Sequence, residues 1–424
     1  MGSRLHGGAL VLHGGDLKQR SNDTDFRFRP DSDFHYLTGL AEPGAVMVLR
    51  PDHPQPFTLF VRPRDPKAEV WSGRRVGPEG AIEHFDADAA YPLDELAEEL
   101  PKLLDGVREV FVPFGRQRLN QAVLRAIGSL HRANRSGKSP PETLHDARVT
   151  LGEDRVIKDD AALAALRHAV DITVDAHLEA FRATRAGMHE YEIEAIIEHA
   201  FRRRGSTGPG YGSIVGTGDN ATILHYVENA SVLREGELLL VDAGAEWDYF
   251  SGDLTRTVPV SGRFTPAQRD LYDVVLRANQ AGIEAATVGS TIDAIHERCV
   301  RILCEGLIDL GLLDGPLDAA LEQKTYETYY PHRTSHWLGI DVHDAGYYCI
   351  DGEPRPLQPR MVLTVEPALY VGANDERAPQ SLRGCGIRIE DDVLVREDGP
   401  EVLTHRAPKD PDAIEALMGA IARR

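Results

Sequence analysis

The sequence predicts an α/β domain at the N-terminus, followed by an α+β domain whose two halves repeat one pattern of helices and strands. Short runs typical of strands alternate with helical segments over residues 1–131. Beyond residue 155, a pair of helices followed by a group of strands occurs twice. A chain of 424 residues, of which 42% are hydrophobic, is long enough for two or three domains with filled cores.

In the N-terminal region, β-branched and aromatic runs predict strands, and longer apolar-periodic runs predict helices. The strands are expected at Val46–Leu49, Phe57–Val61 and Glu109–Val112, and the helices at 93–104 and 116–131. The polar segment 132–141 then ends in Pro140-Pro141, which is typical of a loop or domain boundary. We therefore place the boundary between residues 132 and 155 and expect domains at 1–150 and 151–424.

In the C-terminal region, the two expected halves have the same order of elements. The first helix pair is expected at 158–184, with apolar residues at 163, 166, 170, 174, 178 and 181, and at 191–204, before Gly205. Strands are expected to follow as far as about residue 260. Thr265-Pro266 has the form of a helix start, and predicts a helix to about residue 286. A helix at 290–310, before Gly311, and strands over 326–395 complete the second half.

Composition excludes several classes of protein. The net charge of −20 argues against non-specific nucleic-acid binding, which needs basic surface. The four cysteines form no Cys-x-x-Cys pair, which favours a reducing compartment over a disulfide-stapled fold. No secretory leader and no run of 18 apolar residues is present, so we expect a cytoplasmic protein with no membrane partner.

Two aspartates, Asp242 and Asp253, flank a predicted β-hairpin. With a turn centred near Trp247-Asp248, the two would lie directly opposite each other on one face. Two carboxylates at that distance repel each other unless a proton or a cation lies between them. The alternative is that they are two unrelated turn residues, since aspartate is common in turns beside glycine.

Three more candidate ligands follow the second helix pair: His336, Glu366 and Glu390. Taken singly, each has an ordinary explanation, such as a hydrogen-bonded core histidine or, for Glu390 and Arg388, the wet face of an edge strand. Together with Asp242 and Asp253 they would form a site with four carboxylates, which two divalent cations would neutralise. Oxygen ligands with one histidine favour Mn²⁺, with Co²⁺, Fe²⁺ and Zn²⁺ as alternatives.

These motifs, in this order, resemble the metal-dependent pita-bread peptidases of family M24, and most closely the aminopeptidase P (Xaa-Pro aminopeptidase) family. In the N-terminal region the resemblance rests on residues 31–39 and 70–75, Asp-Ser-Asp-Phe-His-Tyr-Leu-Thr-Gly and Val-Trp-Ser-Gly-Arg-Arg. In the C-terminal region it rests on Ile223-Leu224-His225-Tyr226, Asp242-Ala243-Gly244, residues 252–257, Ser335-His336-Trp337-Leu338-Gly339, Val342-His343-Asp344, Val365-Glu366-Pro367 and residues 386–390.

The resemblance implies a pita-bread catalytic domain with two metal ions, and release of the N-terminal residue from peptides with proline second, by attack of a metal-bridging hydroxide. Asp253 and Glu390 would bridge the ions, and Glu366 would also move the proton of the bridging water. The implied ligands are Asp242, Asp253, His336, Glu366 and Glu390; His225, His332 and His343 would bind substrate and stabilise the tetrahedral intermediate, Arg388 would pair with the acidic groups, and Tyr211 and Tyr370 would line the site. Arg333 departs from relatives that have glycine there.

Other activities and partners stay open. A prolidase that cleaves only Xaa-Pro dipeptides is the first alternative, and a non-catalytic pita-bread binding protein is the second. The resemblance also implies a homo-oligomer, either a dimer or a tetramer, in which Trp71 would reach a neighbouring subunit's site. The alternative for Trp71 is packing within its own domain.

Overall fold

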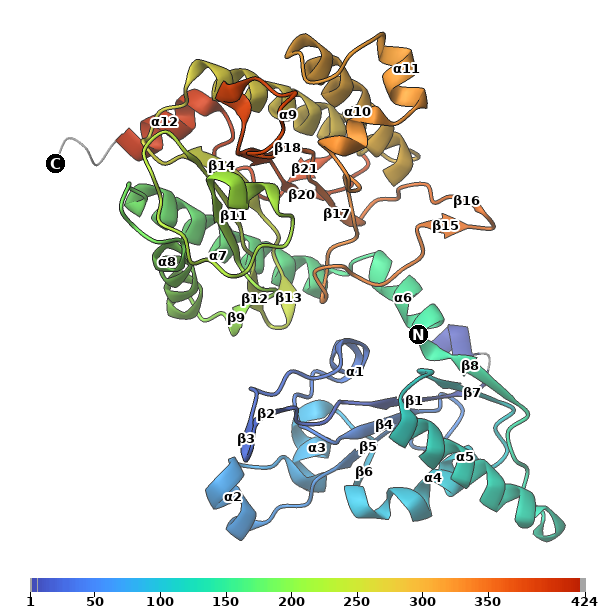
Figure 1. Ribbon diagram of the computed structural model, residues 1–424. Coiled ribbons are helices and arrows are strands. Elements are labelled where there is room, and N and C mark those ends of the chain that lie inside the picture. The colour runs from blue at the N-terminus through green and yellow to red at the C-terminus, as the bar shows by residue number, and fades with distance from the viewer. Residues whose placement is uncertain (1, 6, 420–424) are drawn as a thin grey trace. The chain divides into compact units, whose positions relative to one another are not determined.

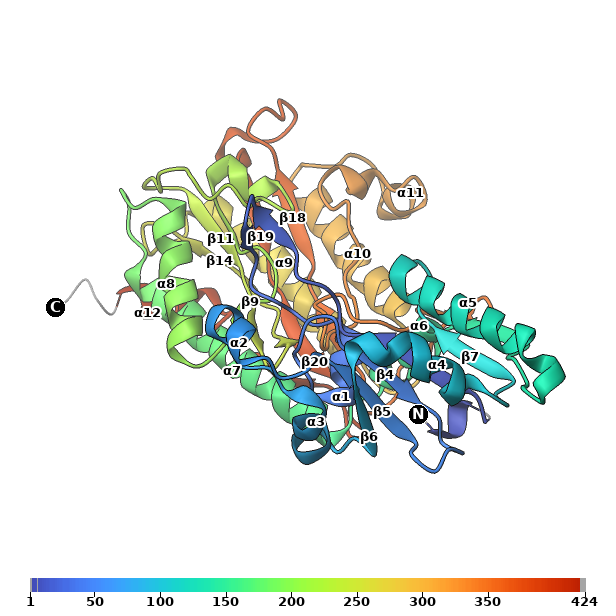
Figure 2. The ribbon, with the colours of Figure 1, turned by 90° about the horizontal axis from the view of Figure 1, so that it is seen from below.

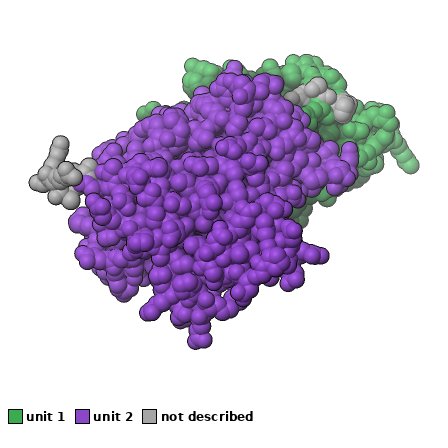
Figure 3. All heavy atoms as spheres, turned by 90° about the horizontal axis from the view of Figure 1, so that it is seen from above, with its two compact units in different colours: residues 1–154 green, residues 155–424 purple. Residues whose placement is uncertain are grey.

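The computed structural model describes residues 2–5 and 7–419. Its contacts divide the chain into two compact units, residues 1–154 and 155–424, which Figure 3 shows in different colours. Unit 1 is an α/β domain and unit 2 an α+β domain, as predicted. Within the described part of the chain, no helix combines the length and the apolar character that crossing a bilayer would require.

Unit 1 is built on a six-stranded mixed sheet in the order β6-β5-β4-β1-β7-β8. Strands β4 and β5 pair antiparallel, and β5 and β6 pair parallel; the three lie side by side in Figure 2. A small separate hairpin joins β2 (Gln19–Ser21) to β3 (Thr24–Asp25). The sheet strands are β1 (Ala9–His13), β4 (Val46–Leu49), β5 (Phe57–Val61), β6 (Ala89–Pro92), β7 (Glu109–Val112) and β8 (Thr143–Asp146).

Helices cover both faces of this sheet because its strands are apolar on both sides. Val11 packs into a core with α4 (Leu96–Leu104) and α5 (Gln117–Arg132). Its neighbours Leu10 and Leu12 point to the opposite face, into a core with α1 (Ser32–Thr38) and α3 (Gly77–Phe85). The remaining helices are α2 (Pro66–Ser72) and α6 (Ala147–Val156), and 3-10 turns lie at Gly2–Leu5, Leu93–Glu95 and Asn134–Ser136.

Unit 2 contains the two predicted helix pairs. Asp159 caps α7, and Thr265 with Gln268 forms a capping box at the start of α9, where Pro266 occupies the first turn. Figure 1 shows the pair α7 and α8 and the pair α9 and α10 on opposite sides of the strands. The helices are α7 (Asp160–Ala183), α8 (Glu190–Arg203), α9 (Pro266–Ala285), α10 (Ile292–Asp309), α11 (Leu317–Glu322) and α12 (Pro411–Gly419).

The strands of unit 2 form small antiparallel sheets between these helix pairs, around one shared core. Hydrogen bonds join the two halves, since the hydroxyl of Thr257 in β14 bonds the backbone of Arg388 in β19 at 3.2 Å. The sheets are β10 (Ile214–Thr217), β11 (Leu238–Asp242) and β14 (Thr255–Pro259); β9 (Gly208–Pro209), β12 (Ala245–Trp247) and β13 (Phe250–Ser251); β17 (Val362–Val365), β20 (Asp391–Leu394) and β21 (Glu401–Val402); β18 (Ala368–Val371) and β19 (Cys385–Arg388); and β15 (Cys349–Ile350) and β16 (Glu353–Pro354).

The prediction of strands from residue 326 onward is wrong for its first part. Thr325–Thr328 is a 3-10 turn, and the chain then runs without a strand as far as Cys349. Residues 334–338 do pair with β17, because the backbone N–H of Thr364 donates to His336 O at 3.0 Å and that of Leu338 donates to Val362 O at 3.0 Å, but the pairing is a single isolated bridge between Trp337 and Leu363. His332, His336 and His343 therefore lie outside the named strands, on a loop where His343 is exposed and the other two are half-buried.

Candidate metal centre

Asp242 and Asp253 come together around the hydroxyl of Tyr211. Asp242 ends β11 and Asp253 precedes β14, and the Oη atom of Tyr211 lies 2.6 Å from Oδ1 of each. The predicted register, with Asp242 directly opposite Asp253, is wrong, because Asp242 pairs with Thr255. The hydroxyl carries one proton, so it can donate to only one of the two carboxylates.

The turn lies one residue later than predicted. Asp248 and Tyr249 occupy it with φ values of 48° and 65°, the left-handed pair of a type I′ turn. Asp253 is therefore displaced by two residues from the position opposite Asp242, and a displacement of two leaves both on the same face. Between them, a Cβ at Gly244 would lie 1.8 Å from the carbonyl oxygen of Gly252, so the close approach of the strands requires glycine.

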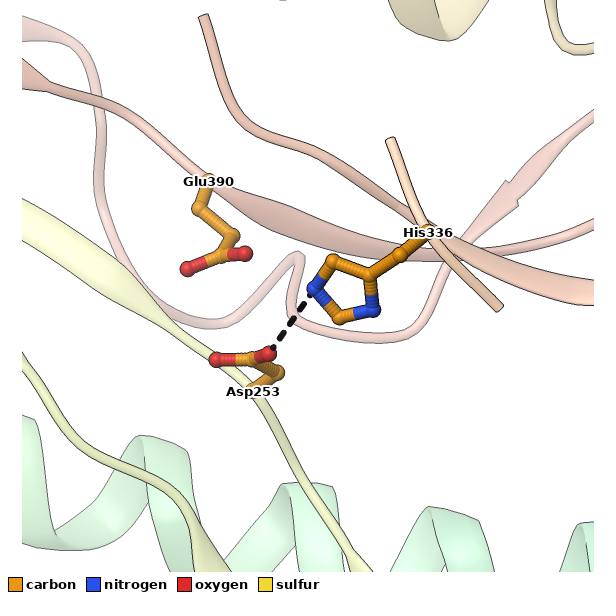
Figure 4. Close-up of side chains that lie close together, drawn as sticks. All are labelled: Asp253, His336 and Glu390. Atoms are coloured by element: carbon orange, nitrogen blue, oxygen red, sulfur yellow. Dashed lines mark ion pairs between the residues drawn. The ribbon is translucent and has the colours of Figure 1, made fainter. Parts of the chain in front are cut away.

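Asp253, His336 and Glu390 form the tightest group of possible ligands. One ligand atom from each lies within 4.8 Å of the other two. Figure 4 shows the Asp253 carboxylate and the His336 ring pointing toward each other, with the Glu390 carboxylate directed at the same space. The three side chains come from separate segments: the end of the hairpin, the loop that follows the 3-10 turn Thr325–Thr328, and the connection between β19 and β20.

His336 is held in the form that could bind a cation through Nε2. Its Nδ1 lies 3.0 Å from the carbonyl oxygen of Trp337, so the ring proton is on Nδ1. Nε2 lies 3.4 Å from Oδ2 of Asp253 and 3.6 Å from Oε1 of Glu366. Nε2 thus faces two carboxylates, and a cation bound there would take the place of its proton and satisfy all three groups.

Arg388 balances part of the negative charge. Its guanidinium donates to Oδ2 of Asp242 at 2.5 Å, to the hydroxyl of Tyr370 at 2.7 Å and to the hydroxyl of Thr255 at 3.1 Å. The Thr255 hydroxyl donates in turn to Oε2 of Glu390 at 2.7 Å. Arg388 is buried, so the prediction's alternative of a wet edge strand is wrong.

The pKa values of these groups show that the site stabilises additional positive charge, either as protons or as cations. Burial raises the pKa of Glu366 to about 8 and that of Glu390 well above its usual value. Burial alone would lower the pKa of His336, but the hydrogen bond with Asp253 and the charge of Glu366 raise it to about 9. Divalent cations would displace these protons, because metal ligands bind in their deprotonated forms. The donor set therefore fits cation binding.

Most of the predicted site residues line one cavity with a volume of about 780 Å³. Its lining includes Asp242, Asp253, His336, Glu366 and Glu390, and also Tyr211, His225, His332, His343 and Arg388. Tyr370 does not line it, but its hydroxyl contacts Arg388 and lies 3.0 Å from Nε2 of His332. His332 Nδ1 lies 3.8 Å from Oε2 of Glu366. The ring of His343 lies against that of His336, with centroids 4.3 Å apart.

Two residues close to the centre were missed by sequence reasoning. Thr255 joins Arg388 to Glu390, as described above. Asp392 is fully buried, and its Oδ2 accepts a hydrogen bond from the backbone N–H of Asp253 at 3.1 Å. The signal for Asp392 was its place in the apolar run after Glu390, where a charged residue needs a partner. Thr255 had no such signal, because threonine is common in strands.

Comparison with known proteins agrees with this site. Residues 164–397 match the family model of metallopeptidase family M24, and residues 1–111 that of the aminopeptidase P N-terminal domain. The Xaa-Pro aminopeptidase of Escherichia coli is 41% identical over 421 residues, or 99% of this chain and 95% of the relative. The structure of Pseudomonas aeruginosa aminopeptidase PepP has a TM-score of 0.97 at 40% identity, over 99% of this chain and 95% of that one. A Zn-substituted E. coli aminopeptidase P in complex with product has a TM-score of 0.94 at 41% identity, with the same coverage. The chain therefore belongs to metallopeptidase family M24.

Proposed function

We infer that this chain is a metal-dependent Xaa-Pro aminopeptidase, which releases the N-terminal residue from peptides with proline in the second position. One observation carries the inference: four carboxylates and one histidine, drawn from separate segments, line a single cavity. The cavity belongs to a chain that is 41% identical to an Xaa-Pro aminopeptidase over almost its whole length.

We propose that this donor set holds two divalent ions, with Asp253 and Glu390 shared between them and Asp242 bound to one. Oxygen donors with one imidazole favour Mn²⁺, with Co²⁺, Fe²⁺ and Zn²⁺ as alternatives. When bound, such ions lower the pKa of a shared water and polarise a peptide carbonyl. Arg388 occupies Oδ2 of Asp242, so Asp242 would bind an ion through Oδ1 alone, the oxygen that lies 2.6 Å from the hydroxyl of Tyr211, which supports a terminal role.

Glu366 is the group that we assign to proton transfer. Its carboxylate lines the metal cavity, with Oε1 3.6 Å from Nε2 of His336, so it would accept a proton from a water held there and return it to the product. His343 would donate a hydrogen bond to the developing oxyanion, and His225 and His332 would contact the substrate. Burial lowers the pKa of His343 and lowers that of His332 to about 4, so both rings are neutral donors near pH 7.

The lining of the cavity supports the proposed substrate. A free N-terminal amine is positively charged, and the carboxylates attract it, which favours release of a single residue. The bond before proline is a tertiary amide without an N–H donor, so the ring must be recognised by shape and apolar contact. Ile214, Leu224 and Val342 supply apolar surface in the same cavity.

We also propose an oligomeric state and a cellular location for the protein. The first is a homo-oligomer, a dimer or tetramer, for which an exposed aromatic side chain is a feature in favour: Trp71 is 91% exposed, so packing within its own domain is wrong. Sedimentation velocity of the wild-type protein and of Trp71→Ala would test it. The second is a cytoplasmic location, which fits four cysteines that are all free thiols.

Matched peptides test the activity and separate it from its alternatives. The purified protein should release the first residue from Xaa-Pro-Yaa and leave both Xaa-Ala-Yaa and the N-acetylated peptide intact. Cleavage of Xaa-Pro dipeptides alone would make the protein a prolidase. A protein that binds no metal and cleaves none of these peptides would be the non-catalytic binding protein, and the inference would be wrong.

A further inference from the structure

A second cavity adjoins the metal cavity in unit 2. It has a volume of about 1110 Å³ and lies along α10 and the 3-10 turn Thr325–Thr328. Asp293, His332 and Arg333 line both cavities, so the two meet at these three side chains. His332 lies 3.8 Å from Glu366, which puts the junction next to the proposed site of peptide cleavage.

Arg333 and Asp293 form an ion pair at this junction. Nη2 of Arg333 donates to Oδ1 of Asp293, while among the described residues Nε and Nη1 of Arg333 have no hydrogen-bond partner. The two side chains are 58% and 43% exposed, so a ligand can reach them. The guanidinium is therefore anchored on one side and retains donors for an oxygen-bearing ligand.

The second cavity differs in charge from the metal cavity. Its lining has four cationic and three acidic side chains, one net positive charge in a chain whose net charge is −20: Arg298, Arg301, Lys324 and Arg333 against Asp293, Glu297 and Glu327. Arg298 has a partner at 3.5 Å in Glu284, and Lys324 has a distant one at 3.9 Å in Glu327. Arg301 is exposed and, within the described residues, forms no ion pair. The cationic groups that, in the part of the chain that the structure describes, keep donors without a carboxylate partner, Arg301 and the remaining N–H groups of Arg333, favour an anionic ligand at this place.

We propose that the leaving part of the peptide runs past Asp293 and Arg333 into this second cavity, where Arg333, Arg301 and Lys324 bind its C-terminal carboxylate. The proposal rests on the Xaa-Pro aminopeptidase function and names a substrate class for it: short peptides with a free carboxyl end. The N-terminal ammonium group of such a peptide lies near the carboxylates of the metal cavity. Its C-terminal carboxylate pairs with the cationic side chains of the second cavity. The enzyme thereby selects peptides by length as well as by their second residue.

The test compares peptides that differ only in the charge of their C-terminus. Peptides Xaa-Pro-(Yaa)n with n from 1 to 4 are made as free acids and as amides, and kcat/KM is measured for each. The wild-type enzyme should prefer the acid by about fivefold or more at the length that spans the two cavities. The preference should appear in KM and should fall as salt is added, because the cations are exposed.

Variants assign the preference to the second cavity. The triple variant Arg333→Gln, Arg301→Gln, Lys324→Gln should lose the acid preference and leave kcat/KM on the amides within about twofold. Arg277→Gln is the matched control, since Arg277 is an exposed arginine of α9 that lines neither cavity. An unchanged acid-to-amide ratio in the triple variant, an equal loss on acids and amides, or no acid preference at any length would overturn the proposal. Failure to cleave any Xaa-Pro peptide would instead refute the proposed function.

Discussion

Asp344 lies between two buried cations, and replacing it by asparagine should destabilise unit 2. The residue directly follows His343 in the loop that carries His336. Lys158 Nζ donates to Oδ2 of Asp344 at 2.7 Å, and Arg155 Nη2 donates to Oδ1. The side chains of Arg155, Lys158 and Asp344 are 4%, 3% and 1% exposed.

The size of the effect follows from the charges that Asp344→Asn would leave behind. Removing one partner of a buried ion pair costs about 3–5 kcal/mol, because the remaining charge stays buried. Two features place the expected loss near the lower end. Burial lowers the pKa of Lys158, so an unpaired amine can lose its proton, and Arg155 retains Asp341 as a partner at 2.6 Å. We expect about 3 kcal/mol, and a fall in Tm of roughly 6–12 °C.

Urea unfolding of the wild type and the variant measures this loss. Asp160→Asn is the matched control, because Asp160 pairs with Arg360 at 2.6 Å but is 98% exposed, and its loss should change stability by about 0.5 kcal/mol or less. Adding Lys158→Met to Asp344→Asn should recover part of the stability. A loss below about 1 kcal/mol for Asp344→Asn, or one equal to that of the control, would refute the reasoning.

Three further predictions concern the metal centre and pH. Asp253→Ala should abolish binding of one or both metal ions, measured by elemental analysis; full metal content with normal turnover would exclude Asp253 as a ligand. His343→Ala should keep the metal and lower kcat on an Xaa-Pro tripeptide by about 100-fold, and a wild-type rate would exclude its role with the oxyanion. Burial lowers the pKa of His177 to about 4, so the unfolded chain binds the extra proton below pH 6.5. Stability should therefore fall by about 2 kcal/mol between pH 7 and pH 5, and unfolding of His177→Gln should lack this part of the pH dependence; equal slopes would contradict it.

Local signals were enough to predict the helix starts and the helix pairs. Thr265-Pro266 predicted the start of α9, and Thr265 caps that helix through the backbone N–H of Gln268. The apolar spacing in residues 158–184 predicted α7, which spans Asp160–Ala183. These features depend on residues within a few positions of one another, so sequence patterns contain them.

The hairpin register could not be predicted in the same way. It depends on Asp248 and Tyr249 taking positive φ values, and tyrosine gives no signal for that conformation. The buried ion group of Arg155, Lys158 and Asp344 was missed for a different reason. Asp344 lies more than 180 positions from Arg155 and Lys158 in sequence, and only the packed fold brings it between them. In the segment from 326 to Cys349, the pairing with β17 is limited to one isolated bridge between Trp337 and Leu363, which is too short to form a strand.

Candidate site residues were easier to identify than their geometry. Ordered motifs named Asp242, Asp253, His336, Glu366 and Glu390, and all five line one cavity. Their pairing through Tyr211 and Thr255 depends on distances between separate segments. Sequence patterns therefore identify which side chains have suitable chemistry for the site, but the hydrogen bonds between them can be known only from the folded structure.

Metal stoichiometry measured together with peptide cleavage tests the central claim most directly. The protein is stripped with a chelator, and Mn²⁺ is added back in steps while release of the N-terminal residue from Xaa-Pro-Yaa is followed. The proposed centre predicts no turnover without metal, and full turnover on binding two equivalents per chain. Turnover by the fully stripped protein, or two bound equivalents without any cleavage of the Xaa-Pro bond, would contradict it.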